Sequence, residues 1–267
     1  YALLHRNRDI PTWCHALDTL DDLDNDTHID AVINLAGASI DCYWTDDNKG
    51  IIKDSRVQTT QRVVEKIKAL STCPKVILQA SAVGFYGLDN DPDAPERAQR
   101  PSFLREVCVD WEQATEGLRD LSIKCAVMRL GVVLDRQSGM LKKLTMPYKL
   151  GLGGPIGAGE QLLPWIHIDD AVKGFHFLIE NQGHGVFDIV APSVVSQRTF
   201  SQTMGRVLNR PAVFPLPTKL VQWLFGQMGE ELLLAGQRCY PQQLLDMGFA
   251  FTYPDLSKAL RHLYELQ

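Results

Sequence analysis

The stretch that most constrains the fold is residues 30–37, with the sequence DAVINLAG. An apolar run with β-branched residues at its centre stops at a turn of small residues that follows Asn34. Such a run is typical of a buried parallel strand, and its end then lies at the edge where open α/β sheets bind ligands. Small residues allow a ligand close to the backbone, and Asn34 can fix neighbouring backbone groups. Taken alone, the octet also fits an ordinary strand-to-loop turn.

Apolar segments with strand and helix character alternate along most of the chain. Thr45, followed by two aspartates, is a typical helix N-cap, and Asp169 is expected to cap a helix starting at Ala171. The alternation predicts an α/β fold, a doubly wound parallel sheet with right-handed crossovers. Strands are expected at 1–4, 30–35, 75–81, 123–130, 185–190 and 212–214; helices at 45–70, 103–118, 171–180, 199–208, from 218, at 241–247 and after 253; and irregular structure at 11–26.

Charge and cysteine usage exclude several classes of protein. A net charge of −5 and a pI near 5.8 give no reason to expect nucleic-acid binding. The 6 cysteines form no C-x-x-C and no metal-like pairing with histidine, so we expect no metal site and a reducing compartment. No apolar run reaches the roughly 20 residues that cross a membrane. We therefore expect a cytoplasmic protein without membrane contacts.

A glycine-rich loop at 151–159 leads into a short strand with the sequence WIHIDD. The loop is too short for a linker, so we interpret it as a ligand-binding loop. For His167, a structural histidine satisfied by the neighbouring aspartates is the alternative to a functional one, and Trp165 is also a natural packing residue. The candidate substrate contacts from this region are Gly153, Gly154, Trp165 and His167.

Seven motifs follow one another along the chain: NLAG at 34–37, DSR at 54–56, SAVGFYG at 81–87, RLGVVL at 129–134, the glycine loop at 151–157, PWIHIDD at 164–170 and GQR at 236–238. In this order they resemble the extended short-chain dehydrogenase/reductase superfamily, and within it the atypical "epimerase family" group of NAD-dependent epimerases and dehydratases. The resemblance implies a Rossmann-type sheet with a smaller mixed C-terminal substrate lobe, and NADP(H) as cofactor. It implies an NADP-binding domain at residues 1–210, with substrate-lobe insertions, and a small C-terminal domain at 211–267.

Basic residues after the first strand favour NADP over NAD. In a dinucleotide fold this turn faces the adenosine ribose, where an arginine accommodates a 2′-phosphate and an acidic residue would select NAD. His5 and Arg6 occupy this turn, although a solvated loop charge is the alternative for Arg6. By resemblance, the further cofactor contacts are Asn34, Leu35, Ala36, Gly37, Arg56, Ala80, Gly131 and Val132.

The chain departs from the superfamily pattern at its beginning. The glycine-rich turn that seats the pyrophosphate on a helix N-terminus would precede Tyr1. A Rossmann sheet without its first strand would leave unpaired backbone groups at its centre. We therefore expect a longer natural chain, and poor folding or weak cofactor binding for a chain that starts at Tyr1.

The catalytic Tyr-x-x-x-Lys pair is also replaced, and Cys108 and Glu112 stand near its position. Four-residue spacing puts both on one helix face, so both should point toward the nicotinamide. Beside a carboxylate and without a nearby cation, the thiol should stay protonated. Ser81 and Tyr86 are the remaining catalytic candidates, although Ala82 competes with Ser81 for the superfamily's serine position and Tyr86 can be a packed aromatic.

The leading hypothesis is therefore an NADP(H)-dependent oxidoreductase or epimerase-like enzyme acting on a small carbonyl or sugar-nucleotide-like substrate. In such an enzyme the protein orients the reactants and the cofactor carries the chemistry. A non-catalytic NADP(H)-binding sensor or scaffold is the alternative, favoured by the loss of Tyr-x-x-x-Lys. We expect a small-molecule ligand and no nucleic acid, and the chain could pair as a homodimer.

Overall fold

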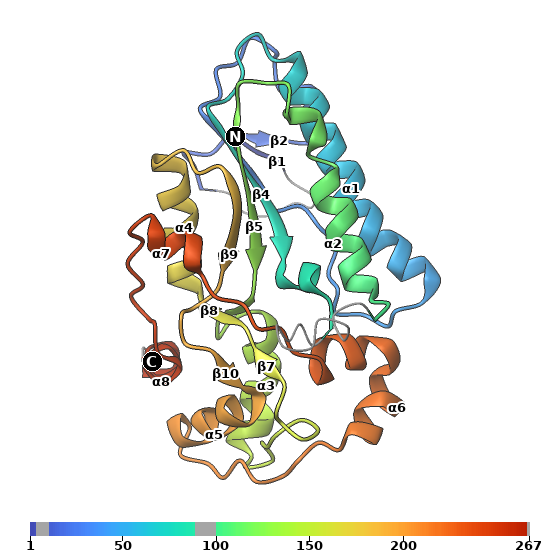
Figure 1. Ribbon diagram of the computed structural model, residues 1–267, viewed down its shortest axis with the longest axis vertical. Helices are drawn as coiled ribbons and strands as arrows, with labels where there is room; N and C mark the ends of the chain where they lie inside the picture. The colour runs from blue at the N-terminus through green and yellow to red at the C-terminus, as the bar shows by residue number, and fades with distance from the viewer. Residues whose placement is uncertain (4–10, 89–99, 266–267) are drawn as a thin grey trace.

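The computed structural model describes residues 1–3, 11–88 and 100–265 of this chain. Figure 1 shows a layer of strands in the upper half with helices on both sides of it. Beneath the carboxyl ends of these strands lie further helices and short strands, here called the lower lobe. This arrangement leaves the strand ends between the two halves of the molecule.

The main sheet has four parallel strands in the order β3 (Ala31–Asn34), β4 (Val76–Ala82), β5 (Lys124–Leu130) and β9 (Gly185–Ile189). β4 and β5 lie in the middle, and β4 is buried over most of its length because both faces are covered. The structure confirms the expected Rossmann-type parallel sheet. The outer strand β3 is less covered, and its Ile33 is 47% exposed.

A separate two-stranded parallel sheet joins β1 (Ala2–Leu3) to β2 (Ala16–Leu17). β2 and the short helix η1 (Leu20–Asp22) lie in residues 11–26, which were expected to be irregular. That expectation was wrong because β2 is only two residues long and its pairing with β1 spans 14 positions of the chain, a tertiary contact that local sequence pattern does not encode.

Helices α1 (Asp46–Ala69) and α2 (Phe103–Gln113) cover one face of the main sheet (Figure 1). Thr45 is the N-cap of α1, as expected, and its side chain accepts a hydrogen bond from Asn48 N at 3.2 Å. The expected second helix ends earlier, and the short helix η4 (Glu116–Leu118) follows it. A buried cluster fills the space under these helices and contains Val63, Val64, Ile67, Ile77, Leu118 and Ile123.

The opposite face of the sheet is covered by α4 (Ile168–Glu180) and α7 (Gln242–Asp246) (Figure 1). Leu178 of α4 and Leu244 of α7 are both buried in one cluster with Met128 of β5 and Ile189 of β9. Burying side chains of this size stabilises each by roughly 1.5–3 kcal/mol relative to exposure. The sheet is thus covered on both faces, as a parallel sheet requires.

The lower lobe contains α3 (Gly139–Lys149), α5 (Gln197–Val207), α6 (Thr218–Gly229) and the antiparallel pair β7 (Leu162–Leu163) and β10 (Val195–Ser196). The parallel pair β6 (Val132–Leu134) and β8 (Trp165–His167) connects it to the main sheet. The last helix, α8 (Leu256–Glu265), packs against α5. Residues 212–214, which the structure describes, do not form the expected strand. Just after them, Leu216 makes an isolated bridge to Ile156.

A buried carboxylate fixes the C-terminal segment to α2. Glu231, in the π-helical turn η5 (Glu230–Leu234), is 4% exposed. Its oxygens accept hydrogen bonds from Ser102 Oγ at 2.8 Å and from the backbone N–H groups of Phe103 and Leu104 at 3.0 Å. These donors lie at the start of α2, where the first N–H groups of a helix lack partners within it. Glu231 accepts their hydrogen bonds, and its negative charge compensates the positive end of the helix. The contact fixes the position of the helix that carries Cys108 and Glu112.

Among the helices of the described ranges, none combines the length and the apolar character that crossing a membrane requires. The division of the chain at residue 210 into two domains stays a prediction.

Candidate active site

The buried Asn34 side chain fixes the conformation of the loop after β3. Its Nδ2 donates to Gln79 Oε1 at 2.9 Å and to Thr60 Oγ1 at 3.0 Å, and its Oδ1 accepts from Ala36 N at 3.2 Å. The expectation that Asn34 fixes neighbouring backbone groups is confirmed. Because the Asn34 side chain is fully hydrogen-bonded, the exposed surface of the loop comes from its backbone and from Leu35, which is 59% exposed.

Two side chains from α1 support the same loop. Ser55 Oγ accepts from Ala38 N at 2.8 Å, and Arg56 Nη1 donates to Ala38 O at 3.1 Å. The guanidinium also lies over the Trp111 ring, 5.2 Å from its centroid. A Cβ at Gly37 would come within 2.9 Å of the guanidinium carbon of Arg56, which explains the small residue there. Arg56 therefore shapes the loop, and its contact with cofactor stays a prediction.

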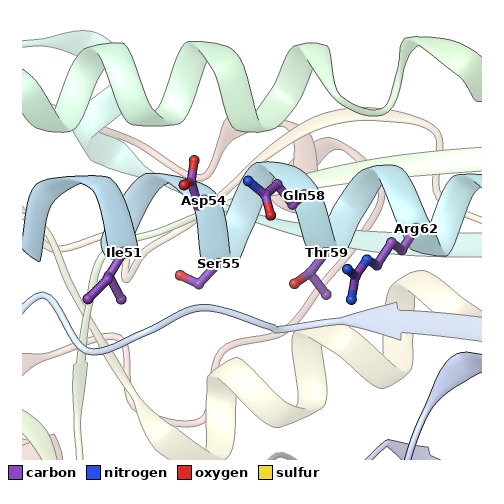
Figure 2. A pocket seen from close by; sticks show the side chains of 6 residues that line it. All are labelled: Ile51, Asp54, Ser55, Gln58, Thr59 and Arg62. Atoms are coloured by element: carbon purple, nitrogen blue, oxygen red, sulfur yellow. The ribbon is translucent and has the colours of Figure 1, made fainter. Parts of the chain in front are cut away.

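A polar hollow of about 280 Å³ lies along α1. Figure 2 shows Ile51, Ser55, Thr59 and Arg62 along one side of the helix, as their spacing of three to four residues requires. Ser55 belongs both to this hollow and to the support of the loop after β3, so the two features are adjacent. Asp54 and Gln58 complete its lining. The hollow offers hydroxyl, amide and guanidinium groups beside the loop.

A buried ion pair joins Arg129, near the end of β5, to Glu112 of α2. Arg129 donates from Nε and Nη2 to the two oxygens of Glu112, at 2.9 and 2.8 Å. Ser81 Oγ donates to the same carboxylate at 2.6 Å, and Ser81 is 1% exposed. A paired, bidentate geometry of this kind compensates two buried charges. Glu112 thus neutralises an arginine and does not replace the superfamily's lysine.

Cys108 lies one helical turn before Glu112 and is 3% exposed. The expectation that it has no cation nearby was wrong, because Arg56 and the ion pair of Arg129 flank this part of α2. Its thiol is nevertheless protonated near neutral pH, since burial raises the pKa of Cys108 to about 11. The direction of the prediction holds, but burial rather than the carboxylate is the main cause.

Tyr86 forms a second pair with a carboxylate from β9. The phenol oxygen lies 2.9 Å from Oδ1 and 3.0 Å from Oδ2 of Asp188, to which it donates. Tyr86 is half-buried at the end of the short helix η2 (Val83–Tyr86), and Asp188 is 9% exposed. Arg129 connects the two pairs, because its guanidinium carbon lies 4.9 Å from the Tyr86 ring centroid and 3.4 Å from that of Phe85.

Three candidate cofactor residues lie near the carboxyl ends of β4 and β5. Ala80 is buried in β4, and Val132 begins β6. Gly131 lies between β5 and β6 in the chain, and its N donates to O of Ile189 in β9 at 3.2 Å. A Cβ at Gly131 would approach Pro164 O to 2.8 Å, so close packing explains this glycine. His5 and Arg6 lie outside the described residues.

The glycine-rich loop packs against the C-terminal segment. A Cβ at Gly154 would come within 1.9 Å of Phe214 O, and one at Gly153 would meet the Tyr148 ring at 2.5 Å. Gly153 O also accepts from Phe214 N at 3.1 Å. Close packing against the Tyr148 ring and the Phe214 backbone thus accounts for Gly153 and Gly154, and their contact with substrate stays a prediction.

Trp165 and His167 are held inside the protein by polar contacts. Trp165 is 1% exposed, and its Nε1 donates to Ser193 O at 3.0 Å. His167 Nδ1 accepts from Asp169 N at 3.0 Å, so His167 and not Asp169 caps α4. The expected cap was wrong because an imidazole acceptor two residues upstream can satisfy the same helix terminus. Substrate contact by either residue remains a prediction.

His167, Asp169 and His262 bring possible metal ligands within 4.8 Å of one another. Because His167 Nδ1 accepts a hydrogen bond, its proton lies on Nε2, which points to His262 Nδ1 at 3.1 Å. A metal-bound histidine instead offers one lone pair and donates with its other nitrogen. The two imidazoles are therefore hydrogen-bonded to each other. The His167 ring also stacks against Tyr253, with 4.0 Å between the ring centroids.

Acidification should weaken this cluster. Burial lowers the pKa of His167 below its ordinary value, although Asp169 opposes the shift. Above the unfolded-state pKa of about 6.5, His167 is neutral in both the folded and the unfolded protein. The full free energy of unfolding is therefore present there. As pH falls below it, the unfolded chain binds the proton first, and the free energy of unfolding decreases until the lowered folded pKa is reached. Urea unfolding between pH 8 and 5 measures this loss.

His167→Asn keeps a capping acceptor and should flatten this pH dependence. The control is His176→Gln, at an exposed position on the same helix, which should leave it unchanged. Equal pH dependence in the parent and in His167→Asn would contradict the assignment.

Sequence reasoning missed Asp188, which lies in the buried second half of β9, at residues 187–189. A single carboxylate within an otherwise apolar strand was a signal, because an ionisable side chain is rarely buried without a partner. The partner, Tyr86, is 102 positions away and could not be identified from spacing.

Two family models match this chain. A model described as the NAD dependent epimerase/dehydratase family matches residues 13–189, and one described as a domain of unknown function (DUF1731) matches residues 216–263. The "Epimerase family protein YfhF" of Bacillus subtilis is 37% identical over 239 residues, which cover 88% of this chain and 78% of that protein.

Solved structures agree in fold. The human epimerase family protein SDR39U1 (isoform 2), crystallised with NADPH, is 35% identical, with a TM-score of 0.86 over 94% of this chain and 88% of that one. A UDP-N-acetylglucosamine 4-epimerase from Bacillus cereus has a TM-score of 0.68 at 13% identity, over 92% of this chain and 79% of that one, a likeness of fold alone.

Proposed function

Because this chain belongs to the NAD dependent epimerase/dehydratase family, we propose that it is an oxidoreductase or epimerase-like enzyme that uses NADP(H). The substrate class is a small carbonyl or sugar-nucleotide-like compound. The single observation that carries the proposal is the pairing of Tyr86 with Asp188 beside the Ser81–Glu112–Arg129 cluster, at the carboxyl ends of three parallel strands. Open α/β sheets bind their ligands at this edge.

The loop after β3 fits the adenosine half of a dinucleotide. It exposes Leu35 and Gly37 beside a backbone fixed by Asn34, and small residues allow close approach of a ligand. We assign Asn34, Leu35, Ala36 and Gly37 to this half, with Arg62 of the adjacent hollow as a cation for phosphate. Ala80, Gly131 and Val132 would line the other half, next to Tyr86.

When bound, the reduced cofactor supplies hydride. The residues of this chain orient the reactants and move a proton. Ser81 is committed to Glu112, so it positions the carboxylate and supports the sheet edge. Tyr86 is the hydroxyl that reaches a substrate from the partly exposed turn after β4. Donation of the Tyr86 proton to the carbonyl oxygen during reduction fits general acid catalysis.

We predict that the protein binds NADPH more tightly than NADH, and that Arg6→Ala narrows the difference. A charge-assisted contact to the 2′-phosphate contributes about 1.5–3 kcal/mol, or roughly tenfold or more in affinity. Isothermal titration of parent and variant with both cofactors measures the preference. The control is Arg119→Ala, which removes an exposed arginine paired with Glu116. Equal parent affinities for NADPH and NADH would refute the assignment.

Cys108→Ala should leave hydride transfer within a few-fold of the parent. The buried thiol is protonated at neutral pH, whereas loss of a working general acid costs about 10²–10⁴ in rate. NADPH oxidation with a panel of aldehydes and sugar nucleotides tests both this variant and the proposed function. A thousandfold loss in a folded, cofactor-binding Cys108→Ala protein would make Cys108 the catalytic group.

A further inference from the structure

The function proposed above uses Asp188 as the hydrogen-bond partner of Tyr86 and gives its carboxyl group no chemical step. We propose that Asp188 stores the proton that Tyr86 delivers to the substrate, so that this pair does the work of the missing Tyr-x-x-x-Lys. The inference rests on the proposed function and adds a residue to its machinery. Asp188 acts through Tyr86 and is therefore a positioning and proton-holding residue.

Geometry selects this pair among the groups at the sheet edge. The phenol oxygen of Tyr86 is 2.9 Å from one carboxylate oxygen of Asp188 and 3.0 Å from the other. Either group can therefore donate to the other, depending on which one holds the proton. Asp188 is buried while Tyr86 is partly exposed, so the phenol forms the outer end of the chain toward a ligand.

The charges around the pair favour a protonated Asp188. Arg129 gives both of its bidentate hydrogen bonds to Glu112, at 2.9 and 2.8 Å. One guanidinium therefore faces two carboxylates, and ionising both leaves a net negative charge in a buried site. Cys239 is the further titratable group facing Asp188, and burial keeps its thiol protonated by raising its pKa.

The pKa directions agree with the geometry. Burial raises the pKa of Asp188, and the charge of Glu112 adds to this, although the Tyr86 hydrogen bond and Arg129 oppose it. Burial also raises the pKa of Tyr86 to about 12. A phenolate is therefore scarce at neutral pH, and a proton received from Asp188 lets Tyr86 give up its own proton without becoming one.

The substrate carbonyl carbon accepts a hydride from the reduced nicotinamide, and its oxygen takes the Tyr86 proton to complete an alcohol. Tyr86 takes the proton of the Asp188 carboxylic acid, so the phenol is restored and Asp188 becomes a carboxylate. Solvent then returns one proton to Asp188. In the oxidation direction, the Asp188 carboxylate accepts the proton through Tyr86.

The first test is the pH profile of 4-nitrobenzaldehyde reduction by NADPH. In the parent protein, the rate should fall as pH rises through the pKa of Asp188, because the acid form supplies the proton. Asp188→Asn should lose this inflection and fall about 10²–10⁴-fold in rate at the low-pH plateau. An unchanged inflection in Asp188→Asn would overturn the proposal, since a merely structural role affects folding and not the profile.

The second test needs no turnover. In ¹³C-aspartate-labelled protein, the Asp188 carboxyl signal, identified by its loss in Asp188→Asn, should titrate above the ordinary value of about 3.9. Tyr86→Phe should raise its midpoint further, because it removes a hydrogen bond donated to the charged form. A midpoint at or below the ordinary value, or one insensitive to Tyr86→Phe, would overturn the relay.

The two tests separate the relay from the function on which it rests. A parent protein that neither binds NADPH nor reduces the aldehyde contradicts the proposed function, and the carboxyl titration then decides whether Tyr86 and Asp188 share a proton. A parent that reduces the aldehyde with the same pH profile as Asp188→Asn keeps the proposed function and eliminates Asp188.

Discussion

Arg129→Met is expected to lower the free energy of unfolding by about 3–5 kcal/mol, because it leaves the carboxylate of Glu112 buried without its cation. The side chains of Arg129 and Glu112 are 10% and 13% exposed, so water screens the pair little. Methionine keeps much of the arginine volume, and the loss therefore reports charge more than cavity. Urea denaturation at pH 7 measures it.

The matched control is Lys53→Met, since Lys53 pairs with Asp110 on the same helix as Glu112 but is 35% exposed. It should cost at most about 1 kcal/mol, as partly exposed pairs do. The double variant Arg129→Met/Glu112→Leu should recover part of the loss, limited by the Ser81 hydroxyl that then lacks its acceptor. Equal losses for Arg129→Met and Lys53→Met would contradict the buried ion pair.

Tyr86→Phe should reduce the rate of carbonyl reduction by about 10²–10⁴, the usual effect of removing a general acid. Phenylalanine keeps the ring that faces Arg129 and removes only the phenol that bonds Asp188. Cofactor affinity should therefore stay at the parent value. Single-turnover reduction of 4-nitrobenzaldehyde at saturating NADPH measures the chemical step.

Tyr264→Phe is the control, because it also removes a phenol, one that lies 2.7 Å from Thr145 Oγ1 in the lower lobe. Its reduction rate should match that of the parent. A Tyr86→Phe protein that reduces the aldehyde at the parent rate would show that Tyr86 is a packed aromatic and nothing more.

Local pattern was sufficient to predict the main sheet and the helices on it. The apolar run before Asn34 forms β3, and Thr45 caps α1, because strand burial and helix capping depend on residues close together in sequence. The same locality explains the errors. β2 depends on a distant partner, and the cap of α4 is an imidazole that sequence rules for N-caps do not favour.

The candidate site was only partly predictable, because its polar groups meet through long-range contacts. Cys108 and Glu112 were identified from spacing, but the cation that pairs with Glu112 comes from β5. Tyr86 was identified on its loop, whereas Asp188 joins it from β9. The glycines at 153 and 154 suggested a ligand, and the structure shows a neighbouring backbone and ring that also require them.

The central claim is that this protein transfers hydride from NADPH to a carbonyl carbon. The most direct measurement uses NADPH with deuterium in the transferred position at nicotinamide C4 and follows the label into the alcohol formed from 4-nitrobenzaldehyde by mass spectrometry. We predict deuterium on the alcohol carbon with the parent protein, and a rate that falls with Tyr86→Phe. Tight NADPH binding without transfer of deuterium to the aldehyde or to any of a panel of sugar nucleotides would contradict this proposal. That result would identify a non-catalytic binding module.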